Sequence, residues 1–169
     1  MEEKEINVDS LNGSERQVKQ VIVMRKDLGM RKGKMVSQGS HASLGALLQC
    51  FHKEPIFANE EELSEHEKEQ LKGNPLMLGT RYSVEFENHS YLDKWLNGIF
   101  TKICLGVNSE EELVSLYERI KKENPNIPCV MIEDSGLTEF HGVKTKTCIG
   151  IGPFWSDEID VFTNYLKLL

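Results

Sequence analysis

Apolar residues along this chain follow two patterns, short continuous runs and longer stretches with helical spacing. The run from Val21 to Met24 is rich in β-branched residues and predicts a strand over 19–25. Comparable runs predict strands over 101–107, 128–132 and 145–151. Apolar positions three or four residues apart predict helices from Lys34 to about Phe51 and over 91–96, 108–123 and 157–166. Strands that alternate with helices favour an α/β fold with a mostly parallel or mixed sheet, covered on both faces.

Residues 53–88 interrupt this alternation. Pro55 ends the preceding helix, and Asn59 is expected to cap an acidic helix that continues to Leu71. Residues 82–86 alternate in polarity and predict a short strand or an extended edge. The segment is expected to be a solvated surface insertion; the alternative is a lid or an arm that binds a partner. The chain thus divides into a polar, flexible segment over 1–17 and a single domain over 18–169 with an insertion at about 53–88.

Composition indicates a globular protein of the cytoplasm. The 169 residues suffice for one domain with a hydrophobic core, and no apolar run approaches the roughly 20 residues that cross a membrane. The N-terminus lacks the apolar segment of a secretory signal. Four cysteines are scattered without a C-x-x-C pair, which predicts reduced thiols rather than a disulfide framework or a zinc site. No membrane partner, cofactor or metal is therefore expected.

Charge is distributed unevenly along the chain. The net charge is −7, which by itself argues against binding to nucleic acid. The acidic residues concentrate in 1–16, with five acidic against two basic residues, and in 53–88, with nine against four. Residues 19–34 instead carry six Lys and Arg against one Asp. A local basic cluster favours phosphate binding, although through few contacts that salt would weaken easily.

The helix that follows this basic segment carries the first candidate residues. Lys34, Gln38 and His41 lie on one face, because residues four and seven positions apart are neighbours on a helix. Another face is made of small residues that let the helix pack closely on a sheet: Gly39, Ala42 and Ala46. A cation, an amide and an imidazole at a basic helix N-terminus predict a site for an anionic ligand. The alternative is that Lys34 and Gln38 are solvated and His41 is a half-buried packing residue.

A second group of candidates follows the third predicted strand. Asp134 lies at the end of that strand, where a carboxylate can hold a lysine, orient a water molecule or cap a turn. Thr138 and Thr147 could donate hydrogen bonds into a site, or could occupy strand edges for their β propensity. His141 is a candidate acid or base, with a plain surface position as the alternative. The loops after the first and third strands could meet, since open α/β sheets bind ligands at the carboxyl ends of strands.

Three motifs occur in a fixed order: K-G-K-x-x-x-Q-x-x-H-A from Lys32, I-E-D-S-G-x-T from Ile132 and T-x-x-G-I-G-P from Thr147. Together they resemble the archaeal/eukaryotic-type peptidyl-tRNA hydrolases, over 19–51 and 91–169. The resemblance implies a three-layer α/β/α sandwich on a four-stranded mixed sheet. It also implies hydrolysis of the ester that joins a peptidyl group to the tRNA 3′ end. Gly39 and Ser135 stand where that family commonly has Cys and Ala, and the insertion is longer than the family's usual connection.

The resemblance also implies which residues act. Its functional positions fall on Lys34, Gln38, His41, Asp134, Thr138 and Thr147. We expect catalysis by Lys34, Asp134, Thr138 and Thr147, and substrate binding by Gln38, His41 and the basic residues Arg31 and Lys32. Asp134 is expected to position the attacking water, while Lys34 and hydroxyl donors stabilise the oxyanion or the leaving ribose oxygen.

The implied partner is peptidyl-tRNA, held by its acceptor end and phosphate backbone, and a homodimer is expected because members of that family are often dimeric. Two other functions remain open from the sequence. One is a non-enzymatic protein-binding module that uses the insertion. The other is a hydrolase of a different aminoacyl-tRNA ester, because the pocket for the acyl group cannot be located from motifs.

Overall fold

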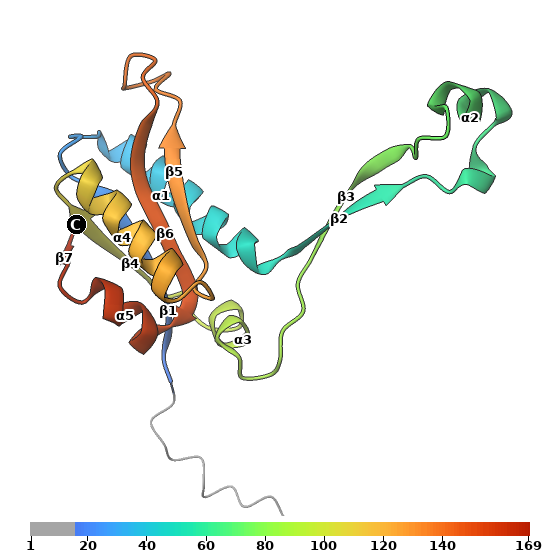
Figure 1. Cartoon of the computed structure of the whole chain (residues 1–169). Coiled ribbons are helices and arrows are strands. Elements are labelled where there is room, and N and C mark those ends of the chain that lie inside the picture. The colour runs from blue at the N-terminus through green and yellow to red at the C-terminus, as the bar shows by residue number, and fades with distance from the viewer. Residues whose placement is uncertain (1–15) are drawn as a thin grey trace, which may run out of the picture.

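The computed structural model describes residues 16–169 and shows a five-stranded mixed sheet with helices on both faces (Figure 1). The predicted flexible segment over 1–17 lies outside the described residues except for Arg16 and Gln17. The strand order is β5-β6-β1-β4-β7. The α/β class is therefore confirmed, with one strand more than the four predicted.

The central strand β1 (Val18–Arg25) lies parallel to β4 (Lys102–Val107) and antiparallel to β6 (Thr145–Trp155). β5 (Cys129–Asp134) pairs antiparallel with β6 at one edge of the sheet. At the other edge, the additional strand β7 (Lys167–Leu168) pairs antiparallel with β4. β1 and β5 thus run in the same direction, and their carboxyl ends lie at the same end of the sheet.

Two predicted boundaries near the C-terminus were wrong. β6 continues past residue 151 to Trp155, because a register shift in β1 between Lys19 and Val21 lets the strand bend and keep its pairing. Gly152 adopts φ +84° in this bend, a conformation that glycine tolerates. The last helix, α5 (Ser156–Thr163), ends before residue 166, and the chain after it forms β7 instead.

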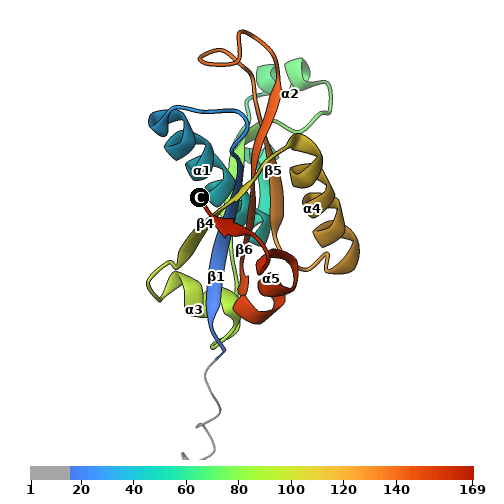
Figure 2. The same ribbon diagram turned by 90° about the vertical axis from the view of Figure 1, so that its left-hand side faces the viewer.

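The helices form two outer layers, which Figure 2 shows on either side of the sheet. α1 (Lys32–Leu47) and α3 (Tyr91–Leu96) cover one face, while α4 (Glu110–Glu123) and α5 cover the other. β1 alternates between the two layers, since Val21 and Val23 belong to the core under α4 and α5, whereas Ile22 and Met24 pack under α1. The predicted helix to Phe51 ends as α1 at Leu47, followed by the 3₁₀ turn η2 (Leu48–Cys50).

α1 lies in close contact with the sheet. Its buried residues include Gly39, Ala42 and Ala46, as the small-residue face predicted. On the sheet side, a Cβ atom added to Gly150 would lie 2.2 Å from the carbonyl oxygen of Ala42. Only glycine fits at residue 150, and this contact fixes the height of α1 above β6. The same contact therefore fixes the positions of the polar residues on α1 relative to the sheet.

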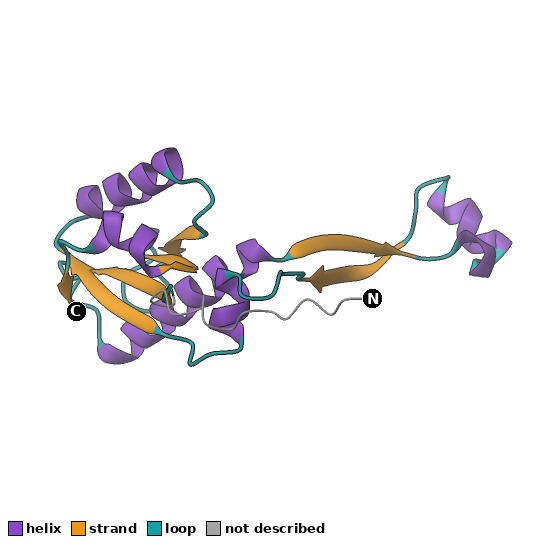
Figure 3. Cartoon of the chain, turned by 90° about the horizontal axis from the view of Figure 1, so that it is seen from below, coloured by secondary structure: helices purple, strands orange, loops and turns teal. Residues whose placement is uncertain are grey.

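Residues 52–83 form an arm that projects from the end of α1 (Figures 1 and 3). Its shaft is the antiparallel pair β2 (His52–Phe57) and β3 (Met77–Ser83), and its tip holds η3 (Glu60–Glu62) and α2 (Glu65–Leu71). Every residue of β2 is exposed. β2 was not predicted, and the strand predicted over 82–86 begins earlier, as β3. Strands that pack on no core show no clear apolar pattern. The acidic helix is capped by Ser64 in a capping box with Glu67, rather than by Asn59.

Two remaining expectations concern the cysteines and the membrane. All four cysteines are free, and burial raises the pKa of Cys129 to about 12 and that of Cys148 to about 11. Within residues 16–169, no helix has both the length and the apolar character needed to cross a bilayer.

Candidate active site

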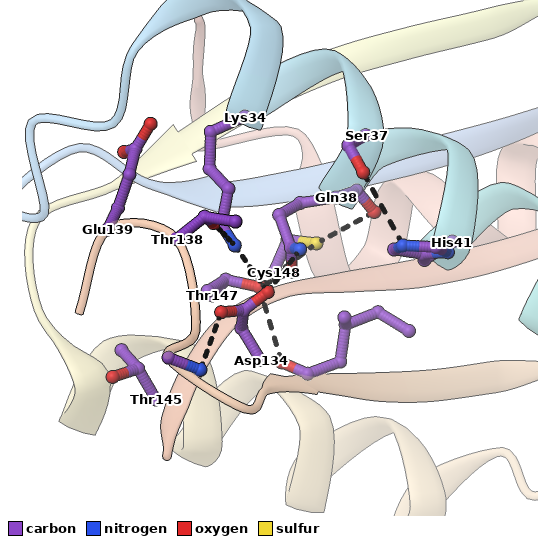
Figure 4. Close-up of polar contacts among 12 residues, drawn as sticks. Lys34, Ser37, Gln38, His41, Asp134, Thr138, Glu139, Thr145, Thr147 and Cys148 are labelled. Carbon is purple, nitrogen blue, oxygen red and sulfur yellow. Dashed lines mark hydrogen bonds and ion pairs between the residues drawn. The ribbon is translucent and has the colours of Figure 1, made fainter. Parts of the chain in front are cut away.

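The loops that follow β1 and β5 meet at the carboxyl ends of these strands, as expected. Lys34 in the first turn of α1 reaches across to Asp134, the last residue of β5, with 2.5 Å between Nζ and Oδ2 (Figure 4). An open cleft of about 500 Å³ lies over this pair. It is lined by Arg31, Gly33, Lys34, Ser37, Gln38, His41, Asp134, Thr138 and Glu139.

Asp134 is held by three donors. Its Oδ2 accepts from Lys34 and, at 2.8 Å, from the side-chain amide of Gln38, while its Oδ1 accepts from the backbone N–H of Gly136 at 2.8 Å. The hydrogen bond from Lys34, and then that from Gly136, hold the pKa of the Asp134 carboxyl below its usual range. The carboxylate is therefore ionised at neutral pH and fixed in orientation.

Gln38 is fixed from below by a threonine. Its side-chain oxygen accepts a hydrogen bond from Thr147 Oγ1 at 2.6 Å, so its N–H group must face Asp134. Gln38 is 2% exposed and Thr147 is 0% exposed. Thr147 was expected to be catalytic, but it lies beneath Gln38 and does not line the cleft.

Lys34 is largely shielded from water, with 10% of its side chain exposed against 13% for Asp134. It also donates to Thr138 Oγ1 at 3.0 Å, and its ammonium lies 5.4 Å from the centre of the Phe140 ring. The hydrogen bonds to Asp134 and Thr138 use two of the three N–H groups of the ammonium. Thr138 is exposed and accepts the bond from Lys34, so its own hydroxyl hydrogen can point into the cleft.

The other predicted residues are divided between the cleft and the rest of the surface. Arg31 and His41 both line the cleft, and Ser37 Oγ lies 3.4 Å from His41 Nε2. Lys32 lies on the opposite flank of α1, where it lines a separate apolar cavity of about 780 Å³ between α1 and α3. His141 is exposed and is not among the lining residues of the cleft.

Sequence reasoning missed Glu139. Its carboxylate accepts from Arg31 Nε at 2.7 Å and from the Arg31 backbone N–H at 3.3 Å. These two bonds hold the pKa of Glu139 below its usual range. The available signal was its place directly after Thr138, but nothing in the sequence shows that this loop folds back onto the start of α1.

The arrangement combines a shielded cation, an ionised carboxylate and a hydroxyl that accepts a hydrogen bond from that cation, all in an open cleft. A cation placed beside a carbonyl oxygen stabilises the negative charge that develops when a nucleophile attacks. A carboxylate nearby can orient that nucleophile. The cleft therefore suits attack on an ester or a similar acyl group. In the part of the chain that the structure describes, no three side chains of the kinds that bind metals gather at one place.

Comparisons with known proteins agree with this chemistry. The model of the family described as peptidyl-tRNA hydrolase PTH2 matches residues 18–169. A peptidyl-tRNA hydrolase of Methanocaldococcus jannaschii is 34% identical over 152 residues, which cover 90% of this chain and 100% of the relative. One of Methanopyrus kandleri is 35% identical over 89% of this chain and 97% of the relative. One of Saccharolobus solfataricus is 31% identical over 90% of this chain and 99% of the relative.

Proposed function

Because this chain belongs to the peptidyl-tRNA hydrolase PTH2 family, we propose that it hydrolyses the ester between a peptidyl, or N-blocked aminoacyl, group and the tRNA 3′ end, releasing free tRNA. The observation that carries the proposal is the Lys34–Asp134 pair at the floor of an open cleft. An activity on tRNA esters accounts for these residues, whereas a non-enzymatic protein-binding module would leave them without a role. The family match does not favour that module or a different aminoacyl-tRNA ester.

Lys34 stabilises the charge that forms on the ester during attack. When the carbonyl carbon becomes tetrahedral, its oxygen gains negative charge, and an ammonium already in place needs no rearrangement to meet it. Asp134 and Thr138 accept from two of the three N–H groups of Lys34, which leaves one for the substrate oxygen. Thr138 is placed to donate its hydroxyl hydrogen to the same oxygen or to the leaving ribose oxygen.

Asp134 positions the attacking water. Its lowered pKa makes it a weak base, so its contribution is to orient the water and to keep Lys34 in place rather than to remove a proton fully in advance. An ester is more reactive than an amide, so this modest assistance suffices. The reaction consumes one water molecule: its oxygen joins the carbonyl carbon, the bond from that carbon to the ribose oxygen breaks, and a proton of the water goes to the ribose oxygen, which gives free tRNA.

Gln38 and Thr147 act indirectly. Thr147 fixes the side-chain amide of Gln38, and Gln38 donates to the same carboxylate oxygen that Lys34 contacts. We therefore assign both as positioning residues instead of the substrate-binding role expected for Gln38 and the catalytic role expected for Thr147. Substrate binding remains proposed for Arg31 and His41, which line the same cleft as Lys34 and Asp134.

The location and assembly of the protein are also part of the proposal. Peptidyl-tRNA arises during translation, so we place the activity in the cytoplasm. A homodimer stays an expectation from the family resemblance. Lys32 remains proposed to contact the phosphate backbone, from the flank of α1 away from the cleft.

The test is release of a labelled N-acetyl-aminoacyl group from tRNA, with and without EDTA. Wild-type protein should release the label in both conditions, and Lys34→Ala should lose about 10²–10³-fold in kcat/KM. Lys68→Ala, which removes a lysine from the arm, is the matched control and should behave as wild type. Absence of release by folded wild-type protein would overturn the proposed function.

A further inference from the structure

Both basic side chains of the cleft, Lys34 and Arg31, are paired with carboxylates of the protein itself. Lys34 pairs with Asp134, and Arg31 pairs with Glu139. The proposed substrate is different, because its 3′-terminal nucleotide brings a phosphodiester only one ribose away from the ester. Among the lining residues, no lysine or arginine is left without a carboxylate partner to receive that charge. A phosphate that bonds Arg31 at Nε, or Lys34 at the place of Asp134, must therefore open one of the two ion pairs.

The two pairs differ in how firmly they are held. The side chains of Lys34 and Asp134 are 10% and 13% exposed, and Gln38 and Gly136 also donate to the carboxylate. The side chains of Arg31 and Glu139 are 78% and 14% exposed, and both hydrogen bonds that hold the Glu139 carboxylate come from Arg31. An ion pair with one partner in water contributes little to stability. The Arg31–Glu139 pair is therefore the one that a ligand can open.

We propose that Glu139 occupies, in the free protein, the place on Arg31 that the 3′-terminal phosphodiester of tRNA takes when the substrate binds. The inference rests on the proposed function, since it takes the substrate to be an ester at the tRNA 3′ end. Glu139 is then a specificity-determining residue. A phosphate that replaces its carboxylate on Arg31 keeps this cation paired with an anion, whereas an uncharged group in the same place would form no ion pair.

The position of Glu139 in the cleft fits a phosphodiester bound on Arg31. Figure 4 shows Lys34 and Gln38 between Glu139 and His41, and all four residues line the cleft. A phosphate at the Glu139 end leaves the ester over Lys34 and Asp134. The acyl group then extends toward Ser37 and His41. Esters that lack the terminal phosphate, such as acylated nucleosides, would gain nothing from Arg31.

The experiment compares binding of adenosine 5′-monophosphate and of adenosine by chemical-shift titration. The variants are Glu139→Gln, Glu139→Ala and Arg31→Ala. Removing the Glu139 charge should tighten binding of the monophosphate about two- to fivefold and leave adenosine unchanged. Arg31→Ala should abolish the preference for the monophosphate. In the release assay, the same Glu139 variants should lower KM for the N-acetyl-aminoacyl-tRNA by a similar factor with kcat unchanged.

Glu133→Gln is the matched control, because it removes the same charge from the end of β5 while Glu133 lies outside the cleft and faces Lys144 at 3.8 Å. It should leave the preference for the monophosphate unchanged. The inference is overturned if neither Glu139 variant changes that preference, or if Glu133→Gln changes it equally. Because nucleotide binding is measured without turnover, wild-type protein that binds as expected but releases no acyl group would overturn the function alone.

Discussion

The body of the molecule, which is the five-stranded sheet with its helices, and the arm both contain strands and helices. Only in the body do helices cover the strands. Val21 and Val23 of β1 are 0% exposed between two layers of helices, whereas every residue of β2 is exposed. The arm also leaves Phe57, Met77 and Tyr82 at least 47% exposed. A two-stranded ribbon held only by its own cross-strand pairs is marginally stable. Close positioning of reactive groups is therefore expected in the body and not in the arm.

The difference bears directly on chemistry. In the body, Gly150, Ala42 and the backbone of α1 are in contact, and this contact sets the position of Gln38 and Lys34 over Asp134. The arm contributes no residue to the cleft. Changes in the body should therefore alter catalysis strongly, and changes in the arm should not.

Asp134→Ala should produce the largest loss. Without the carboxylate, the water is no longer oriented and Lys34 loses the partner that holds it, so kcat/KM should fall about 10²–10⁴-fold. The release assay measures the loss, and circular dichroism checks that the protein is folded. Full turnover by folded Asp134→Ala would show that the carboxylate is not part of the site.

Gly150→Val should mainly reduce stability. Its Cβ would lie 2.2 Å from the backbone oxygen of Ala42, so α1 must move away from β6. Overpacking of this kind costs about 1–3 kcal/mol, and more when backbone must shift. Urea denaturation measures the cost. Gly79→Val is the matched control in the arm, where an added Cβ meets nothing within 4 Å; a similar loss at both positions would contradict the close-packing argument.

Thr147→Val should have an intermediate effect. It leaves the buried oxygen of Gln38 without its donor, which costs about 1–3 kcal/mol of stability, and it frees the Gln38 amide to turn away from Asp134. We expect kcat to fall by less than in Asp134→Ala. Thr147→Ser keeps the hydroxyl and should restore kcat. If Thr147→Val retains wild-type kcat, Thr147 is only a packing residue.

Stability should depend on pH through Asp134. Its pKa is lowered in the folded protein, chiefly by the hydrogen bond from Lys34, so the ionised carboxylate stabilises the folded state above the ordinary aspartate pKa. That contribution is lost as pH falls through the lowered pKa, below about 3.9. The difference in unfolding free energy between wild type and Asp134→Asn should therefore shrink from about pH 5 downward. A difference that grows in acid would contradict the lowered pKa.

Replacing residues 53–82 by a short Gly-Ser linker should have the smallest effect. His52 and Ser83 are paired at the base of the arm, so a short linker can join them. We expect kcat/KM to stay at the wild-type value and the unfolding free energy to change by less than about 0.5 kcal/mol. Denaturation and the release assay check both. A large fall in kcat/KM would return the insertion to a functional role.

The body was also the part that sequence could predict. Apolar runs located four of the five strands of the sheet, because buried strands must be apolar on both faces. The helix face with Lys34, Gln38 and His41, and Asp134 after a strand, led to the cleft because carboxyl ends of parallel strands share one edge. β2 and the Ser64 cap were not predicted, because exposed elements show a weaker pattern of apolar and polar residues.

Within the site, the sequence predicted which residues take part better than it predicted whether each one lines the cleft or is buried beneath it. The sequence pattern around Thr147 would be the same if its side chain faced the cleft or lay beneath Gln38. Only the packing of α1 on β6 distinguishes these two positions. Lys32 and Lys34 are two residues apart on a helix, yet they line cavities on opposite flanks. Glu139 required the fold of the β5–β6 loop, which depends on long-range contacts with Arg31.

The most direct test of the central claim is a double-mutant cycle on Lys34 and Asp134, measured as single-turnover release of the acyl group. If the two side chains act as one unit, Lys34→Ala with Asp134→Ala should lose no more activity than the worse single variant. If the two losses multiply, the residues act independently, and the paired cation and carboxylate are not the basis of the reaction.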